Sequence, residues 1–390
     1  VDQPRFSYRG TMLDCARHYF KMDFIKEFID MLALHNINTF HWHLTEDQGW
    51  RAQIDRYPKL TEVGSKRAQT VIGRNTGLYD DTPYGGYYTK DDMREVVKYA
   101  AERHITVIPE IDMPGHMLGA LAAYPELGCT GGPYKVAESW GVFPDILCAG
   151  NPQTYEFVNN VLDEIVDIFP SKYIHIGGDE SPRDRWKECP RCQAEIKKLG
   201  LKGSNGFSAE AQLQCYFMSQ VAKHLAAKGR SIIGWDEILE GDVDKGTTVM
   251  SWRGTDGGFE AAKRGLDVIM SPTTYYYIDY YQTKDNRLTL IGGYLPTEKT
   301  YSYNPVPDDA TPALKAHVKG VQANLWTEYI MGRDLAFYQL LPRVAALAET
   351  GWTDNAKKNY SSFKEREAKL NMLYKHYDWK ACQDIFTPAK

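Results

Sequence analysis

Residues 172–180 read KYIHIGGDE, and this stretch guides the interpretation of the rest of the chain. Its apolar first half predicts a short buried β-strand. Gly177 and Gly178 then allow a tight turn and a close approach to a ligand. Asp179 and Glu180 follow where the strand ends, and because adjacent carboxylates in a confined site do not both ionise easily, the pKa of one should rise toward that of a general acid. The alternative is a polar strand end with two solvated acids.

On both sides of this strand, short apolar segments alternate with longer amphipathic ones. The expected strands are 6–13, 39–44, 106–111, 173–176, 231–235, 247–252, 267–271 and 321–326. The expected helices include 22–35, 90–103, 152–169, 209–228, 257–264 and 335–349. Strands that are mostly separated by helices predict parallel pairing and a closed (β/α)8 TIM barrel, an α/β fold with long loops at its carboxyl-terminal face. The alternative is an open doubly wound sheet, which usually carries a glycine-rich phosphate loop that is missing here.

Polar and aromatic residues gather where the predicted strands end. In a barrel of this kind the active site lies at those ends, and core packing does not readily explain so many clusters on one rim. The clusters are Arg9 with 14–18, 41–43 with 47–48, 110–116, 175–180, 235–237, Trp252, Tyr277 with Asp279, and 326–328. The tyrosine-rich region 275–303 is a long excursion that we expect to form a wall of the site.

The composition is that of an ordinary globular protein, with 43% hydrophobic and 25% charged residues among 390. The net charge is −5 and no basic stripe occurs, so nucleic acid is not an expected partner. No apolar run reaches the ~18 residues of a membrane span. Aromatic residues make up 13% of the chain. Sugar sites favour such residues because the C–H faces of a pyranose stack on flat rings, although most of these rings should simply fill the core.

Seven cysteines leave at least one unpaired within the chain. Cys189 and Cys192 have the spacing of a zinc knuckle, but a second pair of ligands at matching spacing is missing. We therefore expect a local disulfide or two free thiols there, and no metal or cofactor. The chain begins at Val1 without a signal-like segment, which is compatible with a leader or an N-terminal domain ahead of it.

In combination, these motifs resemble the β-N-acetylhexosaminidases of glycoside hydrolase family 20. The resemblance runs from about Arg5 to Trp352 and rests on 8–10 with Asp14 and 17–18, 41–43 with 47–48, 110–116, 175–180, 234–235 and 325–328. It implies a (β/α)8 catalytic domain that removes terminal non-reducing β-linked GlcNAc or GalNAc with net retention. It also implies that the 2-acetamido oxygen of the substrate, and no enzyme carboxylate, attacks the anomeric carbon and gives an oxazolinium intermediate.

The resemblance implies a role for each matching residue. Glu180 would be the general acid and then the base, with a pKa raised by its neighbour; Asp179 would hold the acetamido N–H, and Tyr277 would bind the acetamido oxygen. The other implied contacts are Arg9 to the 3- and 4-hydroxyls, Asp279 and Glu328 to the 4- and 6-hydroxyls, and Trp235, Trp252 and Trp326 as an apolar box. Asp112, His116 and His175 would support the acids from behind, with a hydrogen-bonded loop as the plain alternative.

Two other functions are compatible with parts of the sequence. A metal-dependent barrel hydrolase could draw its ligands from His41, His43, His116, His175, Asp112 and Asp179, but Arg9 lies on the first strand, where such enzymes place their His-x-His pair. A non-catalytic carbohydrate-binding barrel would keep the aromatic box and lose the acid, whereas both carboxylates are present. One stretch, 288–293, has aliphatic residues and glycines where many relatives place an aromatic, so the leaving-group preference is open.

We expect one catalytic domain over 1–390, with a barrel core of about 5–352 and a C-terminal helical extension of about 353–390. The family commonly carries a small α/β domain before the barrel, and only a few residues precede the first strand here. The expected partner is a glycan with a terminal β-GlcNAc or β-GalNAc, and the expected location is secreted, periplasmic or at the cell surface. The sequence does not define the oligomeric state or the preferred sugar.

Overall fold

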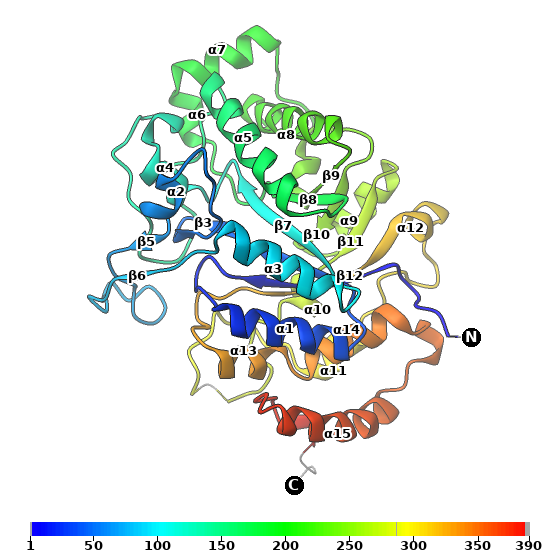
Figure 1. Ribbon diagram of the computed structural model, residues 1–390. Coiled ribbons are helices and arrows are strands. Elements are labelled where there is room, and N and C mark those ends of the chain that lie inside the picture. The colour runs from blue at the N-terminus through cyan, green and yellow to red at the C-terminus, as the bar shows by residue number, and fades with distance from the viewer. Residues whose placement is uncertain (1, 286, 387–390) are drawn as a thin grey trace.

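The computed structural model describes residues 2–285 and 287–386. Within these ranges, parallel strands form a closed barrel in the order β1-β12-β11-β10-β9-β8-β7-β2, with helices around it (Figure 1). The barrel strands are β1 (Tyr8–Asp14), β2 (Thr39–His43), β7 (Thr106–Met113), β8 (Tyr173–Gly177), β9 (Ser231–Trp235), β10 (Thr248–Ser251), β11 (Asp267–Met270) and β12 (Val318–Leu325). The predicted TIM barrel is confirmed.

The helices that cover the barrel occur between its strands and after the last one. They are α1 (Met22–Leu34), α3 (Lys90–Ala101), α5 (Pro152–Ile168), α8 (Ala209–Ala227), α9 (Asp256–Lys263), α13 (Arg333–Leu340) and α14 (Arg343–Trp352). Shorter helices lie in the loops: α2 (Lys59–Glu62), α4 (Leu118–Ala123), α6 (Asp184–Glu188), α7 (Pro190–Leu199), α10 (Thr273–Tyr276), α11 (Thr297–Ser302) and α12 (Pro312–His317). The loops also hold two small antiparallel pairs, β3 (Thr45–Glu46) with β4 (Gly49–Trp50) and β5 (Lys66–Arg67) with β6 (Tyr84–Gly85).

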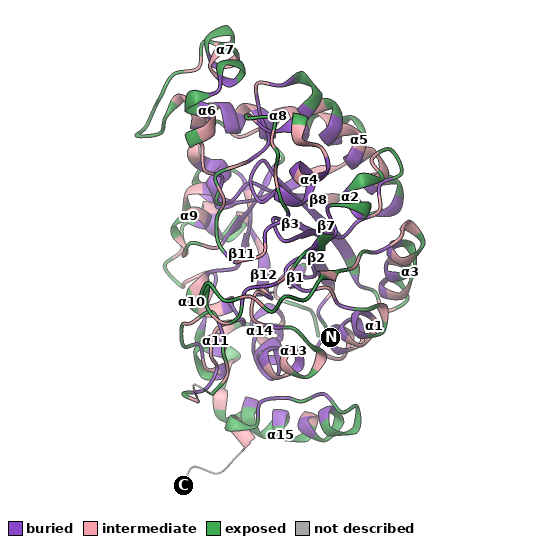
Figure 2. Ribbon diagram, turned by 90° about the vertical axis from the view of Figure 1, so that its left-hand side faces the viewer, coloured by how far each residue is buried: buried purple, intermediate pink, exposed green. Residues whose placement is uncertain are grey.

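Alternate residues of each strand face opposite sides of the barrel wall. Tyr8 belongs to a small apolar cluster inside the barrel, together with Trp235. Leu13 on the same strand belongs to the larger core between the strands and the helices, as do Ile174 and Ile176 of β8. Figure 2 shows this arrangement as buried strands with helices that are buried on their inner faces and exposed on their outer faces. Side chains that point inward near the carboxyl ends of the strands therefore reach the site.

The single helix predicted over 335–349 is wrong, because α13 and α14 are separate helices. Leu341 between them is extended, with φ −108° and ψ 134°. Pro342 has no N–H to donate, and its ring disfavours a helical conformation for the residue before it.

The chain after the barrel forms α15 (Tyr360–His376), at the edge of the molecule (Figure 1). It is held to the barrel helices by His35 and the Tyr374 hydroxyl, 2.6 Å apart, and by the stacked rings of Phe337 and Trp379. In the described part of the chain, no helix combines the length and the apolar character that crossing a membrane requires.

Candidate active site

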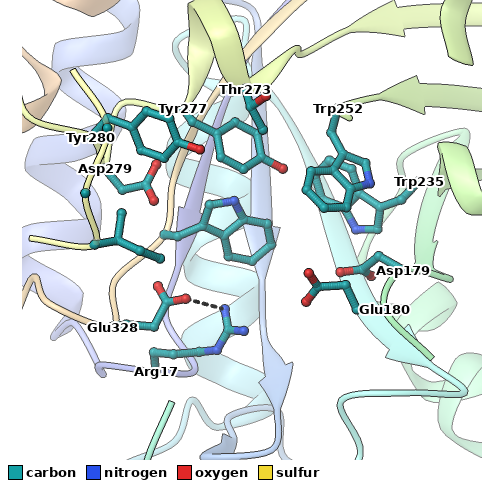
Figure 3. A pocket seen from close by; sticks show the side chains of 14 residues that line it. Arg17, Asp179, Glu180, Trp235, Trp252, Thr273, Tyr277, Asp279, Tyr280 and Glu328 are labelled. Carbon is teal, nitrogen blue, oxygen red and sulfur yellow. Dashed lines mark ion pairs between the residues drawn. The ribbon is translucent and has the colours of Figure 1, made fainter. Parts of the chain in front are cut away.

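A cavity of about 310 Å³ opens at the carboxyl-terminal ends of the barrel strands. Segments that are far apart in the sequence supply its walls (Figure 3). It is lined by Arg17, Asp179, Glu180, Trp235, Trp252, Thr273, Tyr277, Asp279, Tyr280, Ile291, Gly292, Gly293, Trp326 and Glu328. The barrel therefore brings together the two predicted acids, the predicted tyrosine, the three tryptophans and the two carboxylates that were predicted to bind hydroxyls.

The turn after β8 depends on backbone conformations that favour glycine. Gly177 and Gly178 have φ values of 66° and 99°. A Cβ atom on Gly177 would lie 1.7 Å from Asp112 Oδ1, and Gly178 N–H donates to that same oxygen at 3.2 Å. Glu180 also has a positive φ, of 44°, which is uncommon for a residue other than glycine and marks a position where the fold imposes the conformation. Asp112 thus fixes the turn that presents the two acids.

His116 lies behind the two acids. Its Nε2 is 3.6 Å from Asp179 Oδ2 and 3.3 Å from Glu180 Oε2. Its Nδ1 is 3.0 Å from both Glu46 Oε2 and Asp47 Oδ2. Burial disfavours a charged ring, but the charge of Glu46 and the hydrogen bonds to the surrounding carboxylates outweigh it and raise the pKa of His116 well above its ordinary value. A histidine cation therefore links the acids to the loop after β2.

Asp179, and not Glu180, has the raised pKa. Burial raises the pKa of Asp179 to about 7, with the His116 cation opposing and the charges of Glu110 and Glu180 adding to the effect. The His116 ring, whose Nε2 lies 3.3 Å from Glu180 Oε2, lowers the pKa of Glu180 against the effect of burial. The prediction that Glu180 has the raised pKa is therefore wrong for the free protein, because its side chain is 41% exposed, whereas that of Asp179 is 11% exposed. Among the described residues, Asp179 Oδ1 is buried without a hydrogen-bond partner.

Aromatic rings form the walls beside the acids (Figure 3). The ring centroids of Trp235 and Trp326 are 5.8 Å apart, and Tyr277 stacks on Trp252 at 5.9 Å with 12° between the planes. Trp252 Nε1 donates to Glu237 Oε2 at 2.9 Å, which fixes the tilt of this indole. Burial raises the pKa of Tyr277 well above its ordinary value, so its hydroxyl keeps a proton to donate. The walls are thus apolar, with one hydroxyl donor next to the acids.

The opposite end of the cavity is charged. Asp279 and Glu328 face it together with Arg17, whose Nη1 lies 3.9 Å from Glu328 Oε1 (Figure 3). Asp14, the last residue of β1, accepts from the backbone N–H of Arg17 at 3.1 Å and pairs with its guanidinium at 3.2 Å. Burial and the charge of Glu328 raise the pKa of Asp279 well above its ordinary value. Two carboxyl groups and one guanidinium suit a ligand with several hydroxyls.

Comparison with known proteins decides the family of this site. A family model described as glycosyl hydrolase family 20, catalytic domain, matches residues 6–355. The chain belongs to this family. It is 47% identical to a beta-hexosaminidase of Porphyromonas gingivalis over 367 residues, which cover 94% of this chain and 45% of the relative. The chain therefore spans about half the length of that curated relative.

Solved structures of family 20 enzymes are similar to the whole chain. An exo beta-N-acetylglucosaminidase from Vibrio harveyi, in complex with N-acetylglucosamine, matches with a TM-score of 0.85 and 34% identity over 98% of this chain and 60% of that one. A mutant beta-hexosaminidase from Streptomyces plicatus, in complex with GlcNAc, matches with a TM-score of 0.82 and 32% identity over 99% of this chain and 71% of that one. The barrel is thus that of family 20.

Arg9 does not line the cavity of this family 20 chain, and the prediction that it binds sugar hydroxyls is wrong. Its Nε donates to Asn36 O at 2.9 Å and its Nη1 to Phe6 O at 2.8 Å, while its guanidinium lies over the Trp352 ring. Arg9 is the second residue of β1, so its side chain points outward, whereas that of its neighbour points into the barrel. Arg17, which follows the end of the strand, is the arginine at the site.

A buried network supports the aromatic wall from below. Glu110 Oε2 is 2.7 Å from His41 Nε2 and 2.5 Å from His43 Nδ1, and Glu110 Oε1 accepts from Trp235 Nε1 at 2.9 Å. His175 stacks on His41 and lies 4.9 Å from the Trp235 ring. Burial lowers the pKa of His175 well below its ordinary value, so the ring is neutral. His175 therefore lies under the tryptophan, and its predicted support of the acids is indirect.

The same network bears on the metal-dependent alternative. His41, His43 and Glu110 are close enough together to hold an ion. All four ring nitrogens of the two histidines already have partners, since His41 Nδ1 is 2.9 Å from Gln322 Nε2 and His43 Nε2 is 3.0 Å from Glu46 Oε1. An ion at this position would have to displace hydrogen bonds that tie four strands or loops together. The geometry therefore favours a structural role for these histidines.

Several residues that line or support the site were not predicted from the sequence. Glu46 holds Arg17 Nη2 at 3.1 Å as well as the His116 ring, and so connects the two ends of the cavity. Thr273 and Tyr280 line the cavity without having been singled out. The role of Arg17 could have been predicted, because the alternation of side chains along β1 directs Arg9 away from the cavity and the same motif contains Arg17. Glu46 immediately precedes segment 47–48 of the family motif, and no pattern in the sequence marked it as a site residue.

The region 275–303 forms a wall of the cavity, as predicted. Within it, Ile291, Gly292 and Gly293 line the edge, and Ile291 is 42% exposed. Gly293 has a φ of 66°, and a Cβ atom there would lie 2.4 Å from the Tyr280 ring. The glycine therefore allows this edge to pack closely against Tyr280.

Proposed function

We propose that this chain is an exo-acting retaining β-N-acetylhexosaminidase that removes terminal non-reducing β-linked GlcNAc or GalNAc from glycans. The membership of family 20 and the GlcNAc complexes of similar structures support the substrate class. In the proposed reaction the 2-acetamido oxygen of the substrate attacks the anomeric carbon while the bond to the leaving oxygen breaks. The oxazolinium intermediate is then hydrolysed by water, and the product keeps the β configuration.

The observation that carries this proposal is the unpartnered oxygen of Asp179. A buried carboxylate oxygen without a partner among the described residues is costly unless a ligand satisfies it. An acetamido N–H is a suitable donor, and Tyr277 supplies a hydroxyl for the acetamido oxygen in the same cavity. Trp235, Trp252 and Trp326 enclose the space that the methyl group would occupy. A nucleophile gripped in this way gains a high effective concentration at the anomeric carbon.

Protonation of the acids follows from their surroundings. In the free protein the pair holds one proton near neutral pH, and the raised pKa of Asp179 places it there. When a substrate N–H donates to Asp179, the ionised form of this residue is favoured. Glu180 is then the remaining carboxyl that can take the proton and give it to the leaving oxygen. In the second step Glu180 accepts a proton from the attacking water.

The test compares Glu180→Gln with Glu188→Gln, an exposed position on α6. Purified protein should release nitrophenol from nitrophenyl β-GlcNAc, and Glu180→Gln should slow turnover roughly 10²–10⁴-fold, the usual contribution of a general acid. The loss should be larger for a natural disaccharide than for nitrophenol, which hardly needs protonation to leave. Glu188→Gln should behave like the unchanged protein. No release by the unchanged protein, or equal losses for both leaving groups, would reject the assignment.

A further inference from the structure

Four cysteines from distant parts of the chain meet outside the cavity. Cys129 and Cys148 belong to the loop after β7, and Cys189 and Cys192 belong to the loop after β8. The Sγ atom of Cys148 lies 3.7 Å from that of Cys189 and 3.6 Å from that of Cys192, and Cys129 Sγ lies 3.8 Å from Cys192 Sγ. All four sulfur atoms are within 4.8 Å of one another. Three of these side chains are buried and that of Cys129 is half-buried.

These separations match the coordination sphere of a single ion. A tetrahedral zinc site with Zn–S bonds of about 2.3 Å has edges between sulfur atoms of ~3.8 Å. A disulfide would instead bring two sulfur atoms to about 2.0 Å and leave the other two out. Cys148 is almost equally distant from Cys189 and Cys192, which suits a shared centre better than either pairing. The second pair of ligands that the sequence did not reveal is thus supplied by Cys129 and Cys148.

The surroundings favour thiolates. Helix α7 begins next to Cys189 and carries Cys192 in its first turn, so the positive end of the helix points at the cluster. The Arg191 guanidinium donates to Gly128 O at 2.9 Å, beside Cys129, and brings a positive charge close to the cluster. A helix N-terminus and a guanidinium in these positions stabilise the charge of metal-bound thiolates.

We propose that Cys129, Cys148, Cys189 and Cys192 bind one structural zinc ion. Four protein ligands close the coordination sphere and leave no position for a substrate or water, so the ion would take no part in the reaction. Its contribution would be to join the two long loops that follow β7 and β8. Binding free energy of such an ion is also folding free energy for the segments it joins.

The two joined loops are the ones that carry the acid machinery. Leu147, next to Cys148, donates its N–H to Pro114 O at 2.9 Å and accepts from Trp186 Nε1 at 3.0 Å. Gly115 N–H donates to Ser181 Oγ at 3.1 Å. These hydrogen bonds therefore connect the cysteine cluster to the segments that carry His116 and Glu180. We expect loss of the ion to lower the melting temperature and to loosen these segments.

The test measures the metal content of the full-length chain purified without chelator. We expect about one zinc ion per chain, retained in Cys215→Ser and lost in Cys192→Ser, because Cys215 is a buried thiol outside the cluster. Cobalt exchanged into the unchanged protein should give thiolate-to-cobalt charge-transfer absorption with tetrahedral d–d bands, which needs no variant to fold. Denatured in chelator, the chain should titrate as 7 free thiols. A metal-free protein that takes up no added zinc, iron in place of zinc, equal losses in both variants, or a thiol count reduced by disulfides would overturn the proposal.

Discussion

At the residue scale, the most informative contact is that of His116 with the two acids. The ring gives Glu180 a lowered pKa in the free protein, while burial gives Asp179 a pKa of about 7. Neighbouring carboxylates alone would not determine which of them keeps the proton. The unequal exposure of the two side chains and the position of the cation decide it, and neither is visible in the sequence.

The pH dependence of kcat/KM tests this arrangement. The rate should fall as pH rises through about 7, since the pair then loses its last proton and no acid remains for the leaving group. It should also fall at low pH, where both carboxyls are protonated and Asp179 can no longer accept the acetamido N–H as an anion. Initial rates with nitrophenyl β-GlcNAc across the pH range give both limbs. A rate that stays constant through neutral pH and falls only in the alkaline range would contradict the shared proton.

The assignment of Arg17, and not Arg9, as the arginine of the site gives a second prediction at this scale. Arg17→Lys keeps the charge beside Asp14 and Glu46 but loses the planar fork, so KM should rise about tenfold or more, as expected when a charge-assisted hydrogen bond of about 1.5–3 kcal/mol is lost. Arg9→Lys is the matched control, because the Arg9 guanidinium is bound by Asn36 O, Phe6 O and the Trp352 ring and does not line the cavity. It should leave KM unchanged. A rise of KM in Arg9→Lys with no change in Arg17→Lys would restore the original assignment.

At the scale of elements, the position of each strand was predictable from the sequence. The side of the barrel wall that each side chain faces was also predictable, but this information did not enter the prediction for Arg9. Short apolar segments located all the barrel strands to within a few positions. The alternation of side chains along a strand places Arg9 outside the barrel, but the resemblance of the motif Tyr8-Arg9-Gly10 outweighed it. The break at Pro342 followed from local chemistry and was overlooked, because the apolar pattern continues across α13 and α14.

The turn after β8 can be tested with two glycines that both have positive φ. Gly177→Ala would place a Cβ atom 1.7 Å from Asp112 Oδ1, so it should displace the acids, lower the melting temperature and reduce kcat strongly. Gly200→Ala, where no atom lies within 4 Å of the new Cβ, should cost only the backbone strain of about 1 kcal/mol and leave kcat intact. Circular dichroism melts and initial rates separate the two effects. Equal behaviour of the two variants would show that the close contact with Asp112 does not position the acids.

At the scale of the whole molecule, closure of the barrel is what makes the site. It brings the end of β1, the turn after β8 and the segment after β12 to one cavity. The resemblance predicted most of this cavity, because its residues sit in compact motifs at strand ends. Contacts between loops were beyond the sequence: Glu46 with His116 joins segments 70 positions apart in the chain, and the four cysteines lie in loops whose lengths follow no spacing rule.

The central claim is that the acetamido group of the substrate is the nucleophile, and it is tested most directly with matched nitrophenyl β-GlcNAc and β-glucoside. Both have the same leaving group, but the glucoside has a plain 2-hydroxyl and so offers no acetamido oxygen. The account predicts rapid release from the first, essentially none from the second, and a β-configured first product by NMR. Comparable rates on the two substrates, or a first-formed α-product, would contradict it.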